Sequence, residues 1–164
     1  MRVYSFVFGW KLSLWFKTKQ FWSVPFVSSK KREKYLKVVS NDTKRDLKRR
    51  FFSKKFEVTK LTDRMGMRIH GTKLINENYT NIKSEGLVKG TIQIPADGNP
   101  IILLSDHGTI GGYPKIGVVI SADYDKLVQL TPGSKIKFKE VELSSAETLF
   151  KMYDLETQNL ISQI

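Results

Sequence analysis

Residues 90–106 carry the polar side chains that the sequence places best for binding a small molecule. The Asp-Gly-Asn-Pro stretch at 97–100 is a strong turn signal, because Asp and Asn bond to their own backbone, Gly permits a positive φ and Pro excludes a helix. The flanking runs are rich in β-branched residues and predict a hairpin. That hairpin would leave Gln93 and Asp106 at the ends of neighbouring strands, where polar side chains are well placed for a site.

A second candidate lies just downstream, in the Gly-Gly-Tyr-Pro-Lys stretch at 111–115. Gly111 and Gly112 would let backbone N–H groups approach a ligand, and the proline stiffens the bend. Tyr113 and Lys115 would then project, and the bend could hold an anion. The same residues also fit an ordinary tight turn, with the tyrosine in the core and the lysine in solvent. The sequence leaves both interpretations open.

Several familiar kinds of active site are excluded by the sequence. There is no GxxxxGK[ST] phosphate-binding loop and no GxSxG nucleophile motif. There are no cysteines, which excludes disulfides, thiolate metal ligands and a cysteine nucleophile. His70 and His107 stand alone, without a second histidine at metal-ligand spacing, so no metal site is predicted and both are interpreted as ordinary structural or surface residues.

The formal net charge of +12 suggests a nucleic-acid partner until it is divided along the chain. Residues 1–60 hold 17 Lys and Arg against 4 Asp and Glu, whereas residues 61–164 hold 11 against 12. The net charge therefore predicts a phosphate-binding surface only for the first third of the chain. Nucleic acid is not the leading expectation, because runs of charge usually keep a helix face or a linker in solvent.

Short β-rich runs separated by turn residues fill the chain after residue 34. Strands are predicted over residues 35–39, 55–59, 67–70, 90–94, 101–104, 116–120 and 134–143. Helices are predicted from a cap at Asn41 or Asp42 to about Phe52, over residues 122–130, and from the capping box of Ser144 and Glu147 onwards. Many short strands with few helices predict a mainly β domain, either a barrel or a sandwich.

The predicted organisation is one domain over residues 35–143, a C-terminal helix over 144–164, and a basic aromatic N-terminal segment over 1–34 with no assignable role. Lysines interrupt the apolar runs of that segment, so none reaches the roughly 18 residues of a membrane span. It also lacks the clean apolar core of a secretory signal. Together with the absence of cysteine, this predicts a cytoplasmic protein without a transmembrane segment.

Three ordered motifs resemble the KipA/PxpC family, also described as the C subunit of 5-oxoprolinase, as biotin-dependent carboxyltransferase-like proteins or as the second subunit of allophanate hydrolase. The motifs are residues 63–71 (DRMGMRIHG), residues 90–106, and residues 109–116 (TIGGYPKI), which are followed by the expected stretch at 119–123. The resemblance corresponds to the C-terminal portion of the family. The chain is therefore expected to be a truncated or split member.

The resemblance implies a cyclophilin-like β-barrel, here an incomplete version of the family's domain. It also implies work in a complex with a KipI/PxpB-like subunit and a PxpA-like subunit, which would open 5-oxo-L-proline to L-glutamate at the expense of ATP. The expected substrate is a small amide or carboxylate. No covalently bound cofactor is expected; ATP would enter only through the complex, and biotin only as a visiting substrate.

Site residues follow from the same resemblance. Asp106, Lys115 and Tyr113 are expected to be catalytic: the aspartate would orient the substrate, the lysine would stabilise developing negative charge, and the tyrosine would hydrogen-bond or stack. The expected substrate-binding residues are Gln93, Gly111, Gly112, Arg64 and Arg68. The two arginines also fit ion pairs that stabilise the barrel.

The sequence departs from the family pattern at two positions beside the glycine pair. Gly108 stands where the family has Gln, and Ile110 where it has Thr, which removes a side-chain donor and a hydroxyl. Two alternatives to an enzyme component therefore stay open. One is a non-catalytic KipA-like regulatory module that binds a KipI-like partner. The other is a binder of nucleic acid or membrane surfaces that acts through the basic residues of 1–60.

Overall fold

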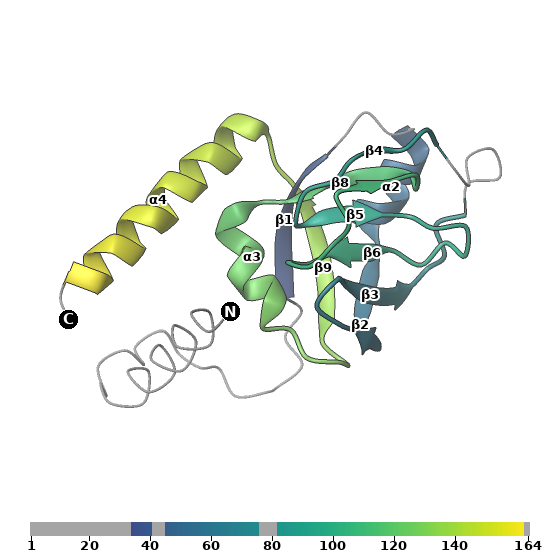
Figure 1. Ribbon diagram of the computed structural model, residues 1–164, viewed down its shortest axis with the longest axis horizontal. Helices are drawn as coiled ribbons and strands as arrows, with labels where there is room; N and C mark the ends of the chain where they lie inside the picture. Colours follow the sequence, from purple (N-terminus) through teal and green to yellow (C-terminus); the bar gives the residue numbers. More distant parts are fainter. Residues whose placement is uncertain (1–33, 41–44, 76–81, 163–164) are drawn as a thin grey trace. The chain divides into compact units, whose positions relative to one another are not determined.

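A closed β-barrel forms the centre of the computed structural model, which describes residues 34–40, 45–75 and 82–162 (Figure 1). The order of the strands around the described wall is β1-β8-β5-β6-β3-β2-β9, and β9 returns to β1. These strands are β1 (Lys34–Ser40), β2 (Lys55–Thr62), β3 (Gly66–Gly71), β5 (Thr91–Gln93), β6 (Ile101–Leu103), β8 (Lys115–Val119) and β9 (Lys135–Glu140). A separate two-stranded sheet pairs β4 (Glu85–Gly86) with β7 (Ile110–Gly111).

Alternation of apolar and polar residues explains why these segments become barrel strands. In β9, Ile136 and Phe138 are buried while the lysines between and beside them face outwards. Leu36 of β1 lies directly across from Phe138 and is also buried. This β1–β9 pairing is parallel, whereas β1 pairs with β8 in the antiparallel sense. The barrel is therefore closed by strands from the two ends of the described domain.

Helix α2 (Arg45–Ser53) contributes aromatic residues to the barrel core. Its Leu47 and Phe51 are buried, and the Phe51 ring stacks on Phe138 with the ring centroids 4.5 Å apart. The same ring lies 5.3 Å from the ring of Phe56 in β2. Leu47 and Phe51 thus form a buried apolar stripe, and the Phe51 ring joins α2 to β2 and β9.

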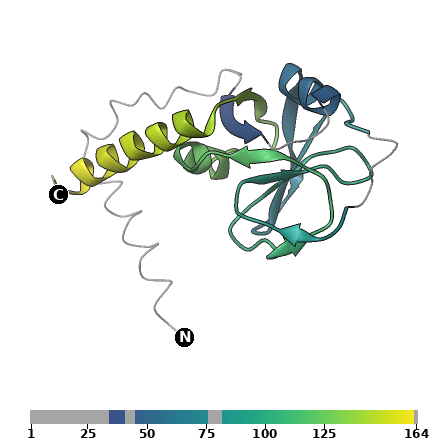
Figure 2. The ribbon, with the colours of Figure 1, turned by 90° about the horizontal axis from the view of Figure 1, so that it is seen from above.

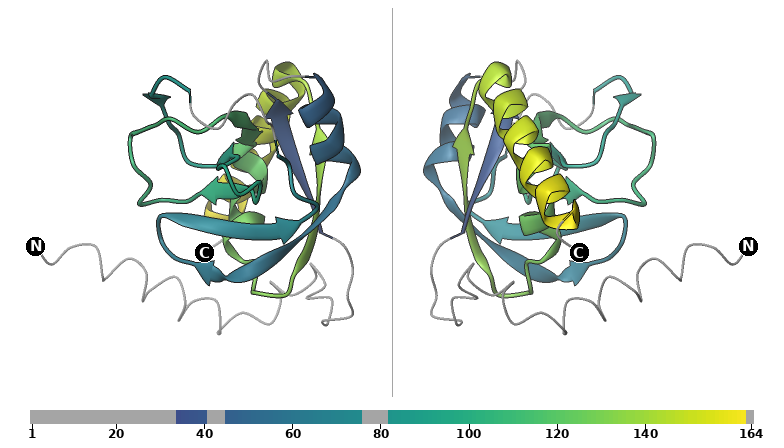
Figure 3. Two further views of the ribbon diagram at one scale, coloured as in Figure 1. Left: turned by 90° about the vertical axis from the view of Figure 1, so that its right-hand side faces the viewer. Right: turned by 90° about the vertical axis from the view of Figure 1, so that its left-hand side faces the viewer.

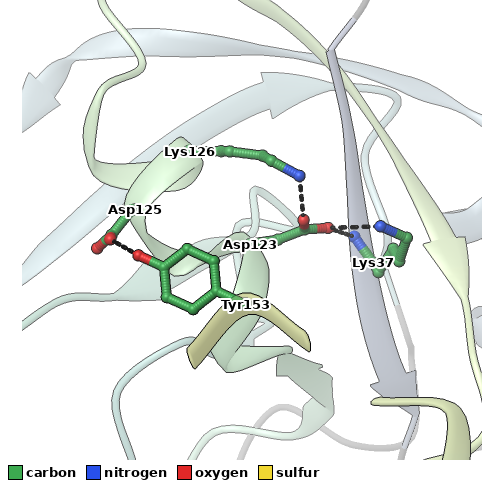
Figure 4. Close-up of polar contacts among 5 residues, drawn as sticks. All are labelled: Lys37, Asp123, Asp125, Lys126 and Tyr153. Atoms are coloured by element: carbon green, nitrogen blue, oxygen red, sulfur yellow. Dashed lines mark hydrogen bonds and ion pairs between the residues drawn. The ribbon is translucent and has the colours of Figure 1, made fainter. Parts of the chain in front are cut away.

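A buried carboxylate anchors α3 (Ser121–Val128) to the barrel wall. Asp123 is only 1% exposed; its Oδ2 accepts the backbone N–H of Lys37 at 2.9 Å, and its Oδ1 accepts Lys126 Nζ at 2.6 Å (Figure 4). The Lys37 Nζ lies 3.7 Å from the same carboxylate. Because Lys37 belongs to β1, this network fixes the first turn of α3 against the strand that closes the barrel.

Helix α4 (Leu143–Ser162) runs beside α3 (Figures 2 and 3). The hydroxyl of Tyr153 donates a hydrogen bond to the Asp125 carboxylate of α3, as Figure 4 shows. Since this hydrogen bond joins a carboxylate to a phenol, it raises the pKa of Tyr153 above its usual value. No helix in the part of the chain that the structure describes is long and apolar enough to cross a membrane.

The predicted fold class, mainly β with a barrel and a few helices, is confirmed. All the strands predicted after residue 34 are present, and the three predicted helices correspond to α2, α3 and α4. The barrel closes on itself within the described residues, because β1 and β9 pair along five positions. The segment before Lys34, together with the expected cap at 41–42, lies outside the described residues.

Candidate functional site

The small β4–β7 sheet covers the outer face of the barrel at Gln93. In β5, Ile92 faces the core and is fully buried, so Gln93 must point to the outside of the barrel. It is nevertheless only 5% exposed. A Cβ added to Gly111 of β7 would lie 2.9 Å from Gln93 Nε2 and 2.8 Å from Leu87 Cδ1. The absence of a side chain at residue 111 therefore lets β7 lie directly against the glutamine.

The amide nitrogen of Gln93 is buried without an acceptor among the described residues. A buried donor without an acceptor typically costs about 1–3 kcal/mol. An oxygen atom of a bound molecule would remove that cost, so Gln93 is the strongest indication of a ligand position on this face.

Lys115 supplies a positive charge beside Gln93. The two residues are paired in the β5–β8 register, at an irregularity of the ladder. The Nζ of Lys115 lies 2.5 Å from Glu85 Oε2 and 3.4 Å from the Gly86 carbonyl oxygen, and its side chain is only 17% exposed. Lys115 is therefore not the solvated charge of an ordinary turn: it ties β8 to β4.

The rest of the glycine bend is packed equally closely. The carbonyl of Gly112 accepts the Ile82 N–H at 2.8 Å, and a Cβ at this position would come within 3.0 Å of the Ile82 carbonyl oxygen. Tyr113 is 41% exposed, so it is not a core aromatic. Gly111 and Lys115 thus lie beside Gln93 on one face of the barrel, and Gly112 and Tyr113 follow Gly111 in the same bend.

Asp106 does not join that group. The antiparallel β5–β6 register pairs Gln93 with Ile101, at the turn end of the hairpin, whereas Asp106 follows the opposite end of β6. Gln93 and Asp106 do lie at the ends of neighbouring strands, as predicted, but antiparallel neighbours end in opposite directions, so the two side chains do not share one site. Asp106 instead forms an ion pair with Arg64, with Nε and Oδ2 2.8 Å apart.

The two arginines consequently have different surroundings. Arg64 is held at the Asp106 end, where its carbonyl also accepts the Asp106 N–H at 3.0 Å. Arg68 of β3 is exposed and pairs with Ile101, which in turn pairs with Gln93. Arg68 therefore lies on the outside of the barrel at the same register position as Gln93, with β6 between their two strands. Of the two arginines, Arg68 is the better placed to bind a substrate carboxylate.

Sequence reasoning missed Glu85 and Leu87, which complete the cover over Gln93. They belong to a segment whose strand, β4, is two residues long and shows no alternation. The one signal available was a carboxylate in a turn-rich stretch, which is too common to use. No group of three His, Cys, Asp or Glu side chains in the described ranges is arranged to hold a metal ion.

Comparison with known proteins places the chain in a defined group. The family model for the carboxyltransferase domain, subdomain A and B, matches residues 18–140. The C subunit of 5-oxoprolinase from Haemophilus influenzae is 44% identical over 88 residues, which cover 54% of this chain and 28% of the relative. The protein of the same name from Escherichia coli is 35% identical over 96 residues, covering 58% of this chain and 31% of the relative.

Solved structures agree with the sequence matches. The urea carboxylase of Kluyveromyces lactis has a TM-score of 0.71 and 25% identity, over 80% of this chain and 13% of that protein. The chain therefore has the fold of one portion of that larger enzyme, and it spans less than a third of the length of the two curated relatives.

Proposed function

Because the chain belongs to the family of carboxyltransferase domains of subdomain A and B, we propose that it is a component of a 5-oxoprolinase-type, biotin-dependent carboxyltransferase-like complex. In this proposal it supports the ATP-dependent conversion of 5-oxo-L-proline to L-glutamate together with other subunits. The names of its two curated relatives support both the type of reaction and the role of one subunit among several.

The observation that carries the proposal is the buried, unpartnered Nε2 of Gln93 beside Lys115. Opening a lactam places negative charge on the carbonyl oxygen, and fixed donors in a dry site stabilise that charge. Gln93 would donate to the substrate oxygen, and Lys115 would supply positive charge once its contact with Glu85 is exchanged for the substrate. The exposed ring of Tyr113 would stack on the substrate or hydrogen-bond to it.

Other residues take supporting roles in this proposal. Arg68 would hold the substrate carboxylate, since it is an exposed cation in the same row as Gln93. Asp106, fixed by Arg64, would position the loop that leads into β7 and would not touch the same substrate atom. The partners would be KipI/PxpB-like and PxpA-like subunits. ATP would be bound through the complex, and biotin would at most visit as a substrate.

A second candidate is a non-catalytic KipA-like module that binds a KipI-like protein. Two observations favour it: Lys115 already lies 2.5 Å from Glu85, and Gly108 and Ile110 stand where the family carries polar side chains. Such a module would bind its partner without supporting turnover.

The test is a reconstitution of the full chain with the KipI/PxpB-like and PxpA-like proteins of the same source, followed by measurement of glutamate formation from 5-oxoproline and ATP. Gln93→Leu should lower kcat about a hundredfold, the usual cost of removing one oxyanion donor. Gln158→Leu is the matched control, because it makes the same chemical change on the exposed surface of α4. Unchanged turnover in both Gln93→Leu and Lys115→Met would refute the site. If the wild-type chain binds its partners but the complex forms no glutamate, the second candidate is favoured.

A further inference from the structure

The outer face of β9 carries a row of lysines that the proposed function does not use. Because Ile136 and Phe138 face the core, Lys135, Lys137 and Lys139 all lie on the outside of the barrel. Lys135 and Lys139 are exposed, and Lys137 is half-buried. We call this row, together with Tyr35 of β1, the lysine face.

Neighbouring strands extend this positive surface. The β1–β9 register places Tyr35 beside Lys137, and the β2–β9 register places Lys55 on the other side of the same lysine. The three strands lie next to one another in the barrel wall (Figure 1). Tyr35 is 56% exposed, which leaves an aromatic ring accessible in the middle of a cationic surface.

Little negative charge opposes the three lysines of β9. Glu57 lies opposite Lys135 in the register, but no carboxylate in the described ranges forms an ion pair with any of the three. The nearby Glu140 is engaged by Lys48, with Oε1 and Nζ 2.6 Å apart. The lysine face is therefore available to an external polyanion.

The lysine face is also distinct from the Gln93 site. Around the barrel, β8 and β1 separate β5 from β9 on one side, and β6, β3 and β2 separate them on the other. A closed wall has no free strand edge in its described part, so a partner cannot add a strand and must be recognised through side chains.

We infer that the lysine face binds single-stranded nucleic acid without sequence preference. Alternate residues of a strand are spaced by about 6.6 Å, so the three lysines can follow successive phosphates of an extended strand. The exposed ring of Tyr35 offers a surface on which a base can stack. An acidic protein segment would match the charge equally well, but it would leave the exposed aromatic ring without a role. The ring therefore favours a partner that carries bases.

The test uses the full chain and a fluorescein-labelled oligothymidylate of about 12 nucleotides, with binding followed by anisotropy between about 50 and 200 mM salt. Lys135→Ala/Lys139→Ala should weaken binding at least about tenfold and reduce the slope of log affinity against log salt by about 1.4, or about 0.7 per lost phosphate contact. Tyr35→Ala should weaken binding about fivefold to a hundredfold through lost stacking, whereas Tyr35→Phe should stay within about twofold of the wild type.

Lys89→Ala/Lys151→Ala is the matched control, because it removes the same charge from exposed positions away from β9, in the turn before β5 and on α4. It should change the affinity less than about twofold. The inference is overturned if this control weakens binding as much as the β9 pair, since binding would then reflect net charge alone. It is equally overturned if the wild type does not bind the oligonucleotide at low salt. A third contrary result is that the wild type binds polyglutamate at least as tightly as the oligonucleotide while Tyr35→Ala leaves oligonucleotide binding unchanged. Circular dichroism of each variant checks that the exposed substitutions leave the fold intact.

Discussion

Replacing Asp123 by alanine should destabilise the domain strongly, because this carboxylate connects α3 to the barrel from a buried position. It is 1% exposed and accepts hydrogen bonds from the Lys37 backbone at 2.9 Å and from Lys126 Nζ at 2.6 Å. Asp123→Ala leaves the Lys37 N–H without an acceptor and removes the common partner of two ammonium groups.

The expected magnitude can be worked from these contacts. An unsatisfied buried N–H costs about 1–3 kcal/mol, and each lost hydrogen bond to a charged group costs about 1.5–3 kcal/mol when its donor stays dry. The side chains of Lys37 and Lys126 are 32% and 63% exposed, so water replaces much of their loss. The free energy of unfolding should therefore fall by about 2–4 kcal/mol, less than the full cost of breaking a buried pair. Asp123→Asn keeps an acceptor and should lose about 1–2 kcal/mol.

The assay is urea unfolding followed by far-ultraviolet circular dichroism. Asp46→Ala is the matched control, because Asp46 pairs with Arg49 at the same i,i+3 spacing, with 2.8 Å between the atoms, but its side chain is 66% exposed. That surface pair should contribute no more than about 0.5 kcal/mol. If Asp123→Ala lowers the stability no more than Asp46→Ala does, the anchoring role of the buried carboxylate is refuted.

Substitutions at Gly117 and Lys48 provide two further tests, the first by the same assay. Gly117→Ala should lower the free energy of unfolding by about 2–4 kcal/mol, because a Cβ would lie 2.5 Å from the Val39 carbonyl oxygen and push β8 away from β1. Gly86→Ala is the control: no atom lies within 4 Å of its added Cβ, so it should change the stability by less than about 0.5 kcal/mol. Equal effects of the two substitutions would contradict this reasoning. The hydrogen bond from Lys48 holds the pKa of Glu140 below its ordinary value of 4.5. The ionised Glu140 therefore stabilises the fold above pH 4.5, and this stabilisation is lost as the pH falls through the lower pKa of the folded state. Lys48→Ala should move the pKa of Glu140 towards 4.5 in a carboxyl NMR titration and make the urea midpoint less sensitive to pH below that value; an unchanged pKa would rule out the lysine as the cause.

Much of the fold could be predicted from local patterns, because those patterns are set by neighbouring residues. The turn at 97–100 forms as expected: the Asp97 carboxylate accepts the Asn99 N–H at 3.1 Å, and Gly98 has a φ of +74°. The alternation of β9 also predicts which residues face the core. The clustering of Gln93 with the glycine bend could likewise be anticipated, since both lie in or beside short strands of the same motif region.

The rest of the site depends on contacts between residues distant in the chain, which no local pattern records. The contact between Lys115 and Glu85 spans two elements, and the two-residue strands β4 and β7 have no periodicity to read. The separation of Asp106 from Gln93 has a different origin: in an antiparallel hairpin the last residue of the first strand meets the first residue of the second, so a residue that follows the second strand lies at the other end. Here the register puts Asp106 beside Arg64.

The parallel pairing of β1 with β9 determines when the domain can be completed during synthesis. β1 is the first described strand to leave the ribosome, and one of its two neighbours, spanning Lys135–Glu140, is the last. Roughly a hundred residues must therefore emerge before the wall can seal, a long-range requirement that slows folding. Until then β1 presents an unpaired edge, so a nascent chain stalled before Lys135 should engage chaperones more strongly than one released after Glu140.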